Sequence, residues 1–242
     1  MIKIFRKIRQ KSLKESKLNQ YMLYAIGEIV LVVIGILFAL QINNWNENRK
    51  QEATLNAIYK IIQSDLEADI EVIDDAIADM KPSKPYYVKV IKGTLIREDF
   101  KTLDTIGGLM NGFPDITLQN RGLNLLLKNA SFDENTDNEL LRNIPLFYAK
   151  YKTEIDIDLR GIGGIWDSSY LMWVNTYAWY TDYVTEVHND QYIEHVLTSP
   201  IYRNQITDFY FSFYVRYFGH LREYQEESKE IIRLIKEQTK AK

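Results

Sequence analysis

The sequence predicts an all-α protein in which one N-terminal transmembrane helix continues into an amphipathic helix and is followed by an antiparallel helical bundle. Three observations favour this fold class. Residues 22–40 contain a single charged residue, Glu28. Apolar residues recur at steps of three and four along most of the remaining chain, and no segment alternates with period two between turns. Only 11 Gly and 5 Pro occur among 242 residues, which disfavours a turn-dense β-sandwich.

The first predicted element is a membrane-spanning helix at residues 21–43. At about 1.5 Å per residue, residues 22–40 reach about 28 Å, close to the thickness of the hydrocarbon core of a bilayer. A cleaved signal peptide is the alternative, but its apolar region is shorter and ends in a small-residue cleavage site. No convincing A-x-A site follows this run, so an uncleaved anchor is predicted.

Charge predicts the orientation of this helix. Seven Lys and Arg residues against Glu15 give residues 1–20 a net charge of +6, whereas Arg49 and Lys50 beyond the span are offset by Glu47 and Glu52. The positive-inside rule therefore puts the N terminus in the cytoplasm and residues 44–242 on the other side of the membrane.

One face of the predicted anchor carries small residues and one acid. These residues share a face at spacings of three and four: Ala25, Glu28, Val32, Gly35 and Ala39. The small pair Gly35 and Ala39 allows close helix approach, so we predict a helix contact, either with a second copy or with a partner helix. The alternatives are that Glu28 reaches toward the headgroups while Gly35 is incidental, or that Glu28 takes part in proton-coupled work.

Beyond the membrane, residues 44–80 form a predicted stalk or first bundle helix. Its apolar stripe comprises Leu55, Ile58, Ile62, Leu66, Ile70, Ile73, Ile77 and Met80. Pro82 and Pro85 break this helix. Further helices are predicted at 86–95, 99–110 and 117–128, the last capped by Thr117.

A capping box at residues 136–139 starts the next helix, which Pro145 should kink. Residues 161–164 (Gly-Ile-Gly-Gly) indicate either a break or a close helix crossing. Aromatic residues then repeat at helical spacing through Tyr180, and a turn follows at residues 188–190. Ser199 and Pro200 start the last helix, which runs to about residue 237.

The string AIGEIVLVVIGILFALQINNWNENRK at residues 25–50, after a basic MIKIFRKIR start, resembles an uncharacterised Gram-negative bacterial family that carries a domain-of-unknown-function label. Weaker similarity covers residues 118–129 and 138–151, where Pro145 departs from the family's pattern. The resemblance implies a single-pass inner-membrane protein with a cytoplasmic N terminus and most of the chain in the periplasm. It implies no activity. The domains are then a basic tail (1–20), a transmembrane helix (21–43), a stalk (44–80) and a periplasmic helical domain (81–242).

The composition excludes several kinds of chemistry. The absence of Cys excludes disulfides, zinc fingers, Cys-ligated clusters and thiol nucleophiles, and a net charge of −3 gives no reason to expect nucleic acid. No P-loop, dinucleotide-binding, nucleophile-elbow or zincin motif occurs. We therefore predict no catalytic, metal or cofactor-binding residue. The many acids of residues 65–79 are interpreted as a solvated helix face rather than as a carboxylate pair for glycoside chemistry.

Aromatic residues are the most unusual feature of the region beyond the membrane. The chain has 17 Tyr, 10 Phe and 4 Trp, and many of them lie between residues 147 and 224. A possible aromatic binding surface comprises Trp166, Tyr170, Trp173, Tyr177 and Tyr180. The same spacing is also typical of core packing, and that interpretation is kept beside the first.

The predicted function is a non-enzymatic, membrane-anchored periplasmic interaction or scaffold module. Its expected partners are the lipid bilayer and either a membrane or periplasmic protein or further copies of the chain. One alternative is a ligand-sensing domain with an aromatic-lined pocket that acts through a membrane partner. A weaker alternative is an enzyme that acts on envelope glycans.

Overall fold

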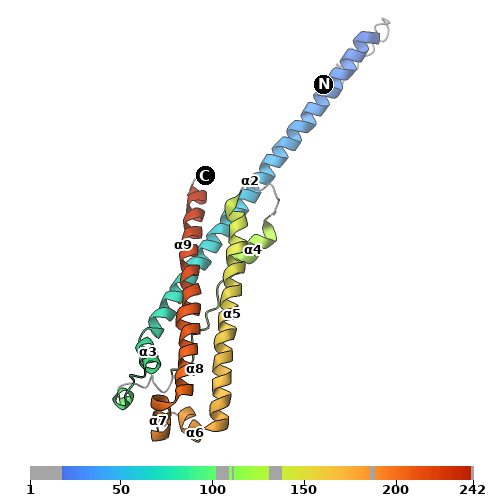
Figure 1. Cartoon of the computed structure of the whole chain (residues 1–242). Coiled ribbons are helices and arrows are strands. Elements are labelled where there is room, and N and C mark those ends of the chain that lie inside the picture. Colours follow the sequence, from blue (N-terminus) through green and yellow to red (C-terminus); the bar gives the residue numbers. More distant parts are fainter. Residues whose placement is uncertain (1–17, 102–108, 111, 131–137, 186–188, 241–242) are drawn as a thin grey trace. The chain divides into compact units, whose positions relative to one another are not determined.

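The computed structural model describes residues 18–101, 109–110, 112–130, 138–185 and 189–240, with side chains from residue 22 onward. The described part is helical and contains no β-strand, which confirms the all-α fold class (Figure 1). In chain order the elements are α2 (Leu18–Met80), α3 (Lys84–Lys92), the 3₁₀ helix η1 (Arg97–Lys101), α4 (Arg121–Asn129), α5 (Glu139–Thr176), α6 (Tyr180–Val184), α7 (Asp190–Thr198), α8 (Pro200–Tyr210), the π-helix η3 (Phe211–Tyr217) and α9 (Phe218–Lys240).

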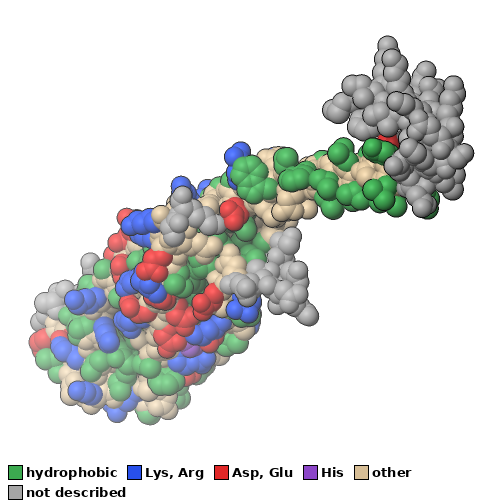
Figure 2. Space-filling model, turned by 90° about the horizontal axis from the view of Figure 1, so that it is seen from above, with side chains coloured by type: hydrophobic (Ala, Val, Ile, Leu, Met, Phe, Trp, Pro, Cys, Tyr) green, Lys and Arg blue, Asp and Glu red, His purple; other side chains and the backbone are tan. Residues whose placement is uncertain are grey.

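The chain divides into two compact units, residues 1–55 and 56–242. In the N-terminal unit, the side chains of residues 22–54 are exposed apart from the half-exposed Ala25 and Asn46. Figure 2 shows hydrophobic side chains along this segment. Among the described helices, α2 alone is long and apolar enough to cross a membrane, with a mean hydropathy of 2.6 over its most apolar 18 residues. Its position near the N terminus suggests a membrane anchor or a signal sequence.

The C-terminal unit is a helical bundle. Residues 56–80 of α2 contribute Ile58, Ile62, Leu66 and Ile73 to its core, as the spacing of this stripe predicts. Helix α5 packs against α9 and η3, and α3 packs against α8. The colour order in Figure 1 shows that α5 and α9 run in opposite directions, so the bundle is antiparallel.

Local signals explain several helix ends. Helix α2 ends at Met80, before the two prolines, and Pro85 lies in the first turn of α3. Gly93 ends α3 with φ of 65°, a left-handed conformation that glycine adopts without steric penalty. The Oγ of Ser199 accepts a hydrogen bond from the Tyr202 N–H, which confirms the predicted start of α8.

Several predicted boundaries are wrong. Helix α4 begins at Arg121 rather than Thr117, because residues 112–120 are not helical and their backbone is held by buried side chains. Only η1 and residues 109–110 of the predicted helix at 99–110 are described, and the remainder lies outside the described residues. Residues 136–137 of the capping box are also outside, but the Asn138 side chain caps α5 by accepting from the Leu141 N–H.

The glycine-rich stretch 161–164 does not break the helix, because α5 continues through it to Thr176. Among the residues that the structure describes, this stretch makes no close helix crossing either. A Cβ built on Gly161, Gly163 or Gly164 meets no atom within 4 Å. The aromatic repeat, by contrast, does not form one helix, since α5 ends at Thr176 and α6 starts at Tyr180.

Candidate functional site

Two buried carboxylates on α2 hold the start of α4. Asp65 and Asp69 lie one turn apart and are only 4% and 2% exposed. Asp65 Oδ2 accepts a hydrogen bond from the Gly122 N–H at 2.7 Å, and its Oδ1 lies 3.2 Å from Arg121 Nη2. A carboxylate is favourable at the N-terminal end of a helix, where backbone N–H groups have no partner within the helix.

Asp69 binds the chain just before α4. Its Oδ1 accepts from the Gln119 N–H at 2.9 Å, and its Oδ2 accepts from the Tyr224 hydroxyl at 2.6 Å. Burial raises the pKa of Asp69 to about 6, because it outweighs the hydrogen bonds from Tyr224 and Gln119, which lower this pKa, and the negative charge of Asp65 raises it further. Asp69 therefore connects α2, the segment before α4 and α9.

A third contact fixes the same segment further upstream. The Tyr217 hydroxyl donates to the Pro114 carbonyl at 3.0 Å and accepts from the Ile116 N–H at 3.2 Å. We call residues 112–120 the extended segment. Its backbone is bound at Pro114, Ile116 and Gln119 by side chains of the core, so it is held in place without belonging to a helix or sheet.

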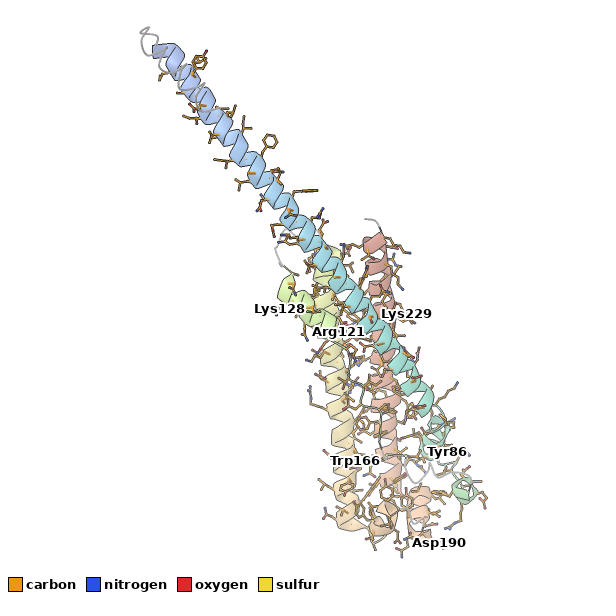
Figure 3. All side chains as sticks on the ribbon, turned by 180° about the vertical axis from the view of Figure 1, so that it is seen from behind. Tyr86, Arg121, Lys128, Trp166, Asp190 and Lys229 are labelled. Carbon is orange, nitrogen blue, oxygen red and sulfur yellow. The ribbon has the colours of Figure 1, made fainter. Side chains whose placement is uncertain are left out.

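The close approach of α4 to α2 depends on Gly122. A Cβ at this position would lie 2.5 Å from Ile62 Cγ1 and 2.8 Å from the Ile62 backbone nitrogen. Only glycine allows this distance, which in turn lets the Gly122 N–H reach Asp65. Figure 3 labels Arg121 and Lys128 on α4, which packs against α5.

A groove of about 450 Å³ lies between the extended segment, α4 and α5. Its apolar lining includes Ile116, Leu123, Leu127, Pro145, Ile155 and Leu159. Lys152, Asp156 and Asp115 also line it and are exposed. The groove belongs entirely to the C-terminal unit.

The five predicted aromatic residues lie at the end of α5 and beyond it. Trp173 is buried and contacts the rings of Trp179, Tyr183 and Tyr202. The other four are half-buried, and three of them form a short row. Trp166 stacks on Tyr170 with ring centroids 4.9 Å apart, and Tyr170 meets Tyr180 at 5.4 Å.

Tyr177 lies apart from that row, against His195 and Trp179, with ring centroids 4.4 and 5.0 Å away. Burial lowers the pKa of His195. The structure therefore brings the five residues into one aromatic cluster at the end of the bundle where α6 and α7 lie (Figure 1). Their role as a binding surface stays a prediction.

A buried charge cluster joins α5 to the junction of η3 and α9. The side chain of Asp158 is 1% exposed, and its two oxygens lie 2.8 Å from Arg216 Nη2 and 2.6 Å from His220 Nδ1. Arg216 belongs to the π-helix η3, whose wider turn changes the face that the following residues present. A buried carboxylate is unfavourable without polar partners, so this cluster couples the helices that carry its members.

The stripe predicted on the anchor lies in the N-terminal unit. Glu28, Val32, Gly35 and Ala39 are exposed and Ala25 is half-exposed, and a Cβ on Gly35 meets no atom within 4 Å. The stripe as a helix contact stays a prediction.

Sequence reasoning missed the buried carboxylates. The sequence pattern predicts that the acids of residues 65–79 form a solvated helix face. This prediction is wrong for Asp65 and Asp69, which are buried. A signal was present, because Asp65 follows Ile62 by three residues and Asp69 follows Leu66 by three, so both acids flank the apolar stripe.

Comparison with known proteins adds one finding. No curated protein and no solved structure matches the chain. Residues 28–120 match a family of unknown function, DUF6090. The match begins in the apolar part of α2, includes Asp65 and Asp69, and ends at Asn120, immediately before α4. Over residues 28–120 the chain is thus similar to a family whose function is unknown.

Proposed function

We propose that the chain is a membrane-anchored interaction module without enzymatic activity, with its basic N terminus in the cytoplasm of a bacterium and residues 44–242 in the periplasm. The exposed apolar side chains of residues 22–40 and the net charge of +6 before them support the anchor and its direction. The helix that carries this apolar segment also supplies the core residues Ile58, Ile62 and Leu66 of the C-terminal unit.

The observation that carries the interaction role is the outward face of α5. Ile157 and Leu171 are 46% and 59% exposed, and Gly161, Gly164 and Ser168 lie between them on the same face. We take this face as a surface for protein contact because it exposes an apolar side chain at each end and only small residues between them. Ile157 and Leu171 would contact the partner at the two ends of this stretch, and the glycines would allow it to approach the backbone of α5 closely.

The glycines strengthen this inference because no close contact in the described part of the chain requires them. A glycine in a helix interior is less favourable than alanine by about 1 kcal/mol. Gly122 is needed for contact with Ile62, whereas Gly161, Gly163 and Gly164 face open space. A partner that approaches the backbone of α5 would account for them.

The partner in this proposal is a membrane or periplasmic protein, or a second copy of the chain. A photo-crosslinking amino acid at Leu171, in the full chain and in native membranes, should give a discrete adduct. An adduct of twice the chain mass identifies a second copy, and any other discrete mass identifies a different protein. The matched control carries the same group at Lys229, an exposed position on α9.

A bulky side chain on the proposed face provides the second control. Gly164→Leu has room in the protein itself, so it should leave folding intact while it reduces the adduct from Leu171. Equal adducts from Leu171 and Lys229, or no adduct from Leu171, would refute the proposed face.

Orientation is tested separately, since the chain contains no Cys. Single cysteines at Ser12 and Lys229 would be treated with a membrane-impermeant maleimide in cells with a permeabilised outer membrane. The cysteine at position 229 should react at once, and that at position 12 only after the inner membrane is opened. The reverse order would overturn the topology.

A second candidate is a ligand-sensing domain that acts through a membrane partner. The groove beside α4 favours it, because about 450 Å³ lies within the range of small-molecule sites, about 300–1,000 Å³. The sequence predicts an aromatic-lined pocket for this candidate, whereas the groove has a mainly aliphatic lining.

A further inference from the structure

The groove between the extended segment, α4 and α5 has a wall that is fixed before any ligand binds. Side chains of Asp65, Asp69 and Tyr217 hold the backbone of this wall from within the core. Burying such groups is unfavourable unless each one is hydrogen-bonded, and here each one is bound to the wall. A preformed site loses little conformational entropy when it is occupied.

The lining of the groove favours a hydrocarbon chain. Its apolar surface comes from Leu, Ile and Pro side chains, and Tyr148 is its single aromatic residue among those described. Leu127, on α4, remains 51% exposed although it lines the groove. A flat aromatic ligand would gain little from stacking here, whereas a flexible aliphatic chain gains affinity with each methylene that it buries.

Charges beside this lining are of both signs. Lys152 and Asp156 lie one turn apart on α5, and Asp115 lies in the extended segment. All three are exposed, and the structure gives none of them an ion pair within the part of the chain that it describes. A cation and carboxylates without partners at one groove are complementary to a headgroup that carries both an anion and a cation.

We propose that this groove binds a phospholipid with a single acyl chain and a zwitterionic headgroup. The acyl chain lies along Leu123, Leu127 and Leu159, the phosphate pairs with Lys152, and the ammonium group pairs with Asp156 or Asp115. The source of such a lipid is the bilayer in which the anchor lies, so this inference rests on the proposed function. A single-chain lipid leaves a bilayer far more readily than a two-chain lipid, because it exposes half as much hydrocarbon to water.

The probe is lysophosphatidylethanolamine with a photoreactive diazirine near the end of its acyl chain. The full-length protein is reconstituted in nanodiscs of phosphatidylglycerol, irradiated with the probe, and digested for mass spectrometry. Labels are expected at residues 116–127 and 155–159, and independently at residues 22–40. An excess of unlabelled lysophosphatidylethanolamine should remove the labels from the groove more effectively than laurate or dodecyltrimethylammonium.

A charge reversal tests the headgroup contact. Lys152→Glu should lower groove labelling about tenfold or more, as expected for one lost hydrogen bond to a charged group. The labels at residues 22–40 should not change. Lys128→Glu is the matched control, since Lys128 lies on α4 without lining the groove (Figure 3).

The two proposals fail in different ways. Labels confined to residues 22–40, or groove labelling that laurate removes equally well and Lys152→Glu leaves unchanged, would overturn the lipid site. Labels in the groove without labels at residues 22–40 would overturn the membrane anchor, and with it the bilayer as the source of the lipid.

Discussion

His220 Nδ1 lies 2.6 Å from Asp158 Oδ2, and this contact joins α9 to a carboxylate of α5 that is almost completely buried. Arg216 approaches the other oxygen of the same carboxylate from η3. Three elements of the bundle, α5, η3 and α9, therefore meet at one acidic side chain. Because a buried carboxylate is unfavourable without a polar or cationic partner, its contact with Arg216 ties the π-helix to the middle of α5.

Replacement of Asp158 should strongly destabilise the C-terminal unit. In Asp158→Asn the buried carboxylate is lost while Arg216, whose side chain is 46% exposed, stays solvated, so we expect the free energy of unfolding to fall by about 1–3 kcal/mol. The measurement is chemical denaturation of the full-length protein in detergent micelles, followed by Trp fluorescence. Asp167→Asn, an exposed substitution on the same helix, should change stability by less than about 0.5 kcal/mol. Equal effects of the two substitutions would contradict a role for the cluster.

Two glycine substitutions should have opposite effects. Gly122→Ala brings a Cβ to within 3 Å of the Ile62 backbone, which cannot move without shifting α2, so we expect a loss of about 2 kcal/mol or more. Gly161→Ala meets no neighbouring atom and should stabilise α5 by about 0.5–1 kcal/mol through helix propensity alone. Thermal unfolding of both variants measures these two changes in stability. A loss of stability in Gly161→Ala as well would contradict the expected gain from helix propensity.

The raised pKa of Asp69 predicts a pH dependence with a definite sign. Because burial raises this pKa from 3.8 to about 6, the folded protein favours the protonated carboxyl. Its contribution to stability is complete below about pH 4 and is lost as the pH rises through 6. The free energy of unfolding of the native protein minus that of Asp69→Asn should thus be larger at pH 4 than at pH 7.

Chemical denaturation of both proteins at the two pH values measures this difference. Asp75→Asn, an exposed substitution on the same helix, should leave the pH dependence of the native protein in place. A difference that grows from pH 4 to pH 7 would show that Asp69 is stabilised as the anion in the fold.

Local periodicity was enough to predict the fold class and much of the core. The steps between Ile58, Ile62 and Leu66 mark a helix face, and all three residues are buried. The same holds for Trp173, which lies on the aromatic stripe and is 3% exposed. Trp179 is equally buried but precedes the short α6, where too few residues repeat for a face to be recognised.

The buried polar contacts of the bundle could not be predicted from periodicity, because each of them joins residues far apart in the chain. Asp69 binds the Gln119 N–H 50 residues later, and Asp158 meets His220 across 62 residues. An acid beside an apolar stripe has the same local pattern whether it faces water or a buried N–H group. The π-helix could not be predicted for a related reason, since a wider turn changes which residues share a helix face without requiring different residue types.

Tyr217 offers a specific test of the extended segment. Tyr217→Phe removes the hydroxyl that binds both the Pro114 carbonyl and the Ile116 N–H, while the ring still fills its place in the core. The groups left without a partner should lower the free energy of unfolding by about 1–3 kcal/mol. Amide hydrogen exchange should also accelerate more at residues 112–120 than in η3, because the lost hydrogen bonds held the wall of the groove, whereas η3, which carries Tyr217, keeps its own backbone hydrogen bonds. Tyr86→Phe, at a half-buried position on α3, is the matched control and should change neither quantity. Uniformly faster exchange in Tyr217→Phe would mean that the hydroxyl stabilises the bundle as a whole, and the extended segment would then not be held by this contact in particular.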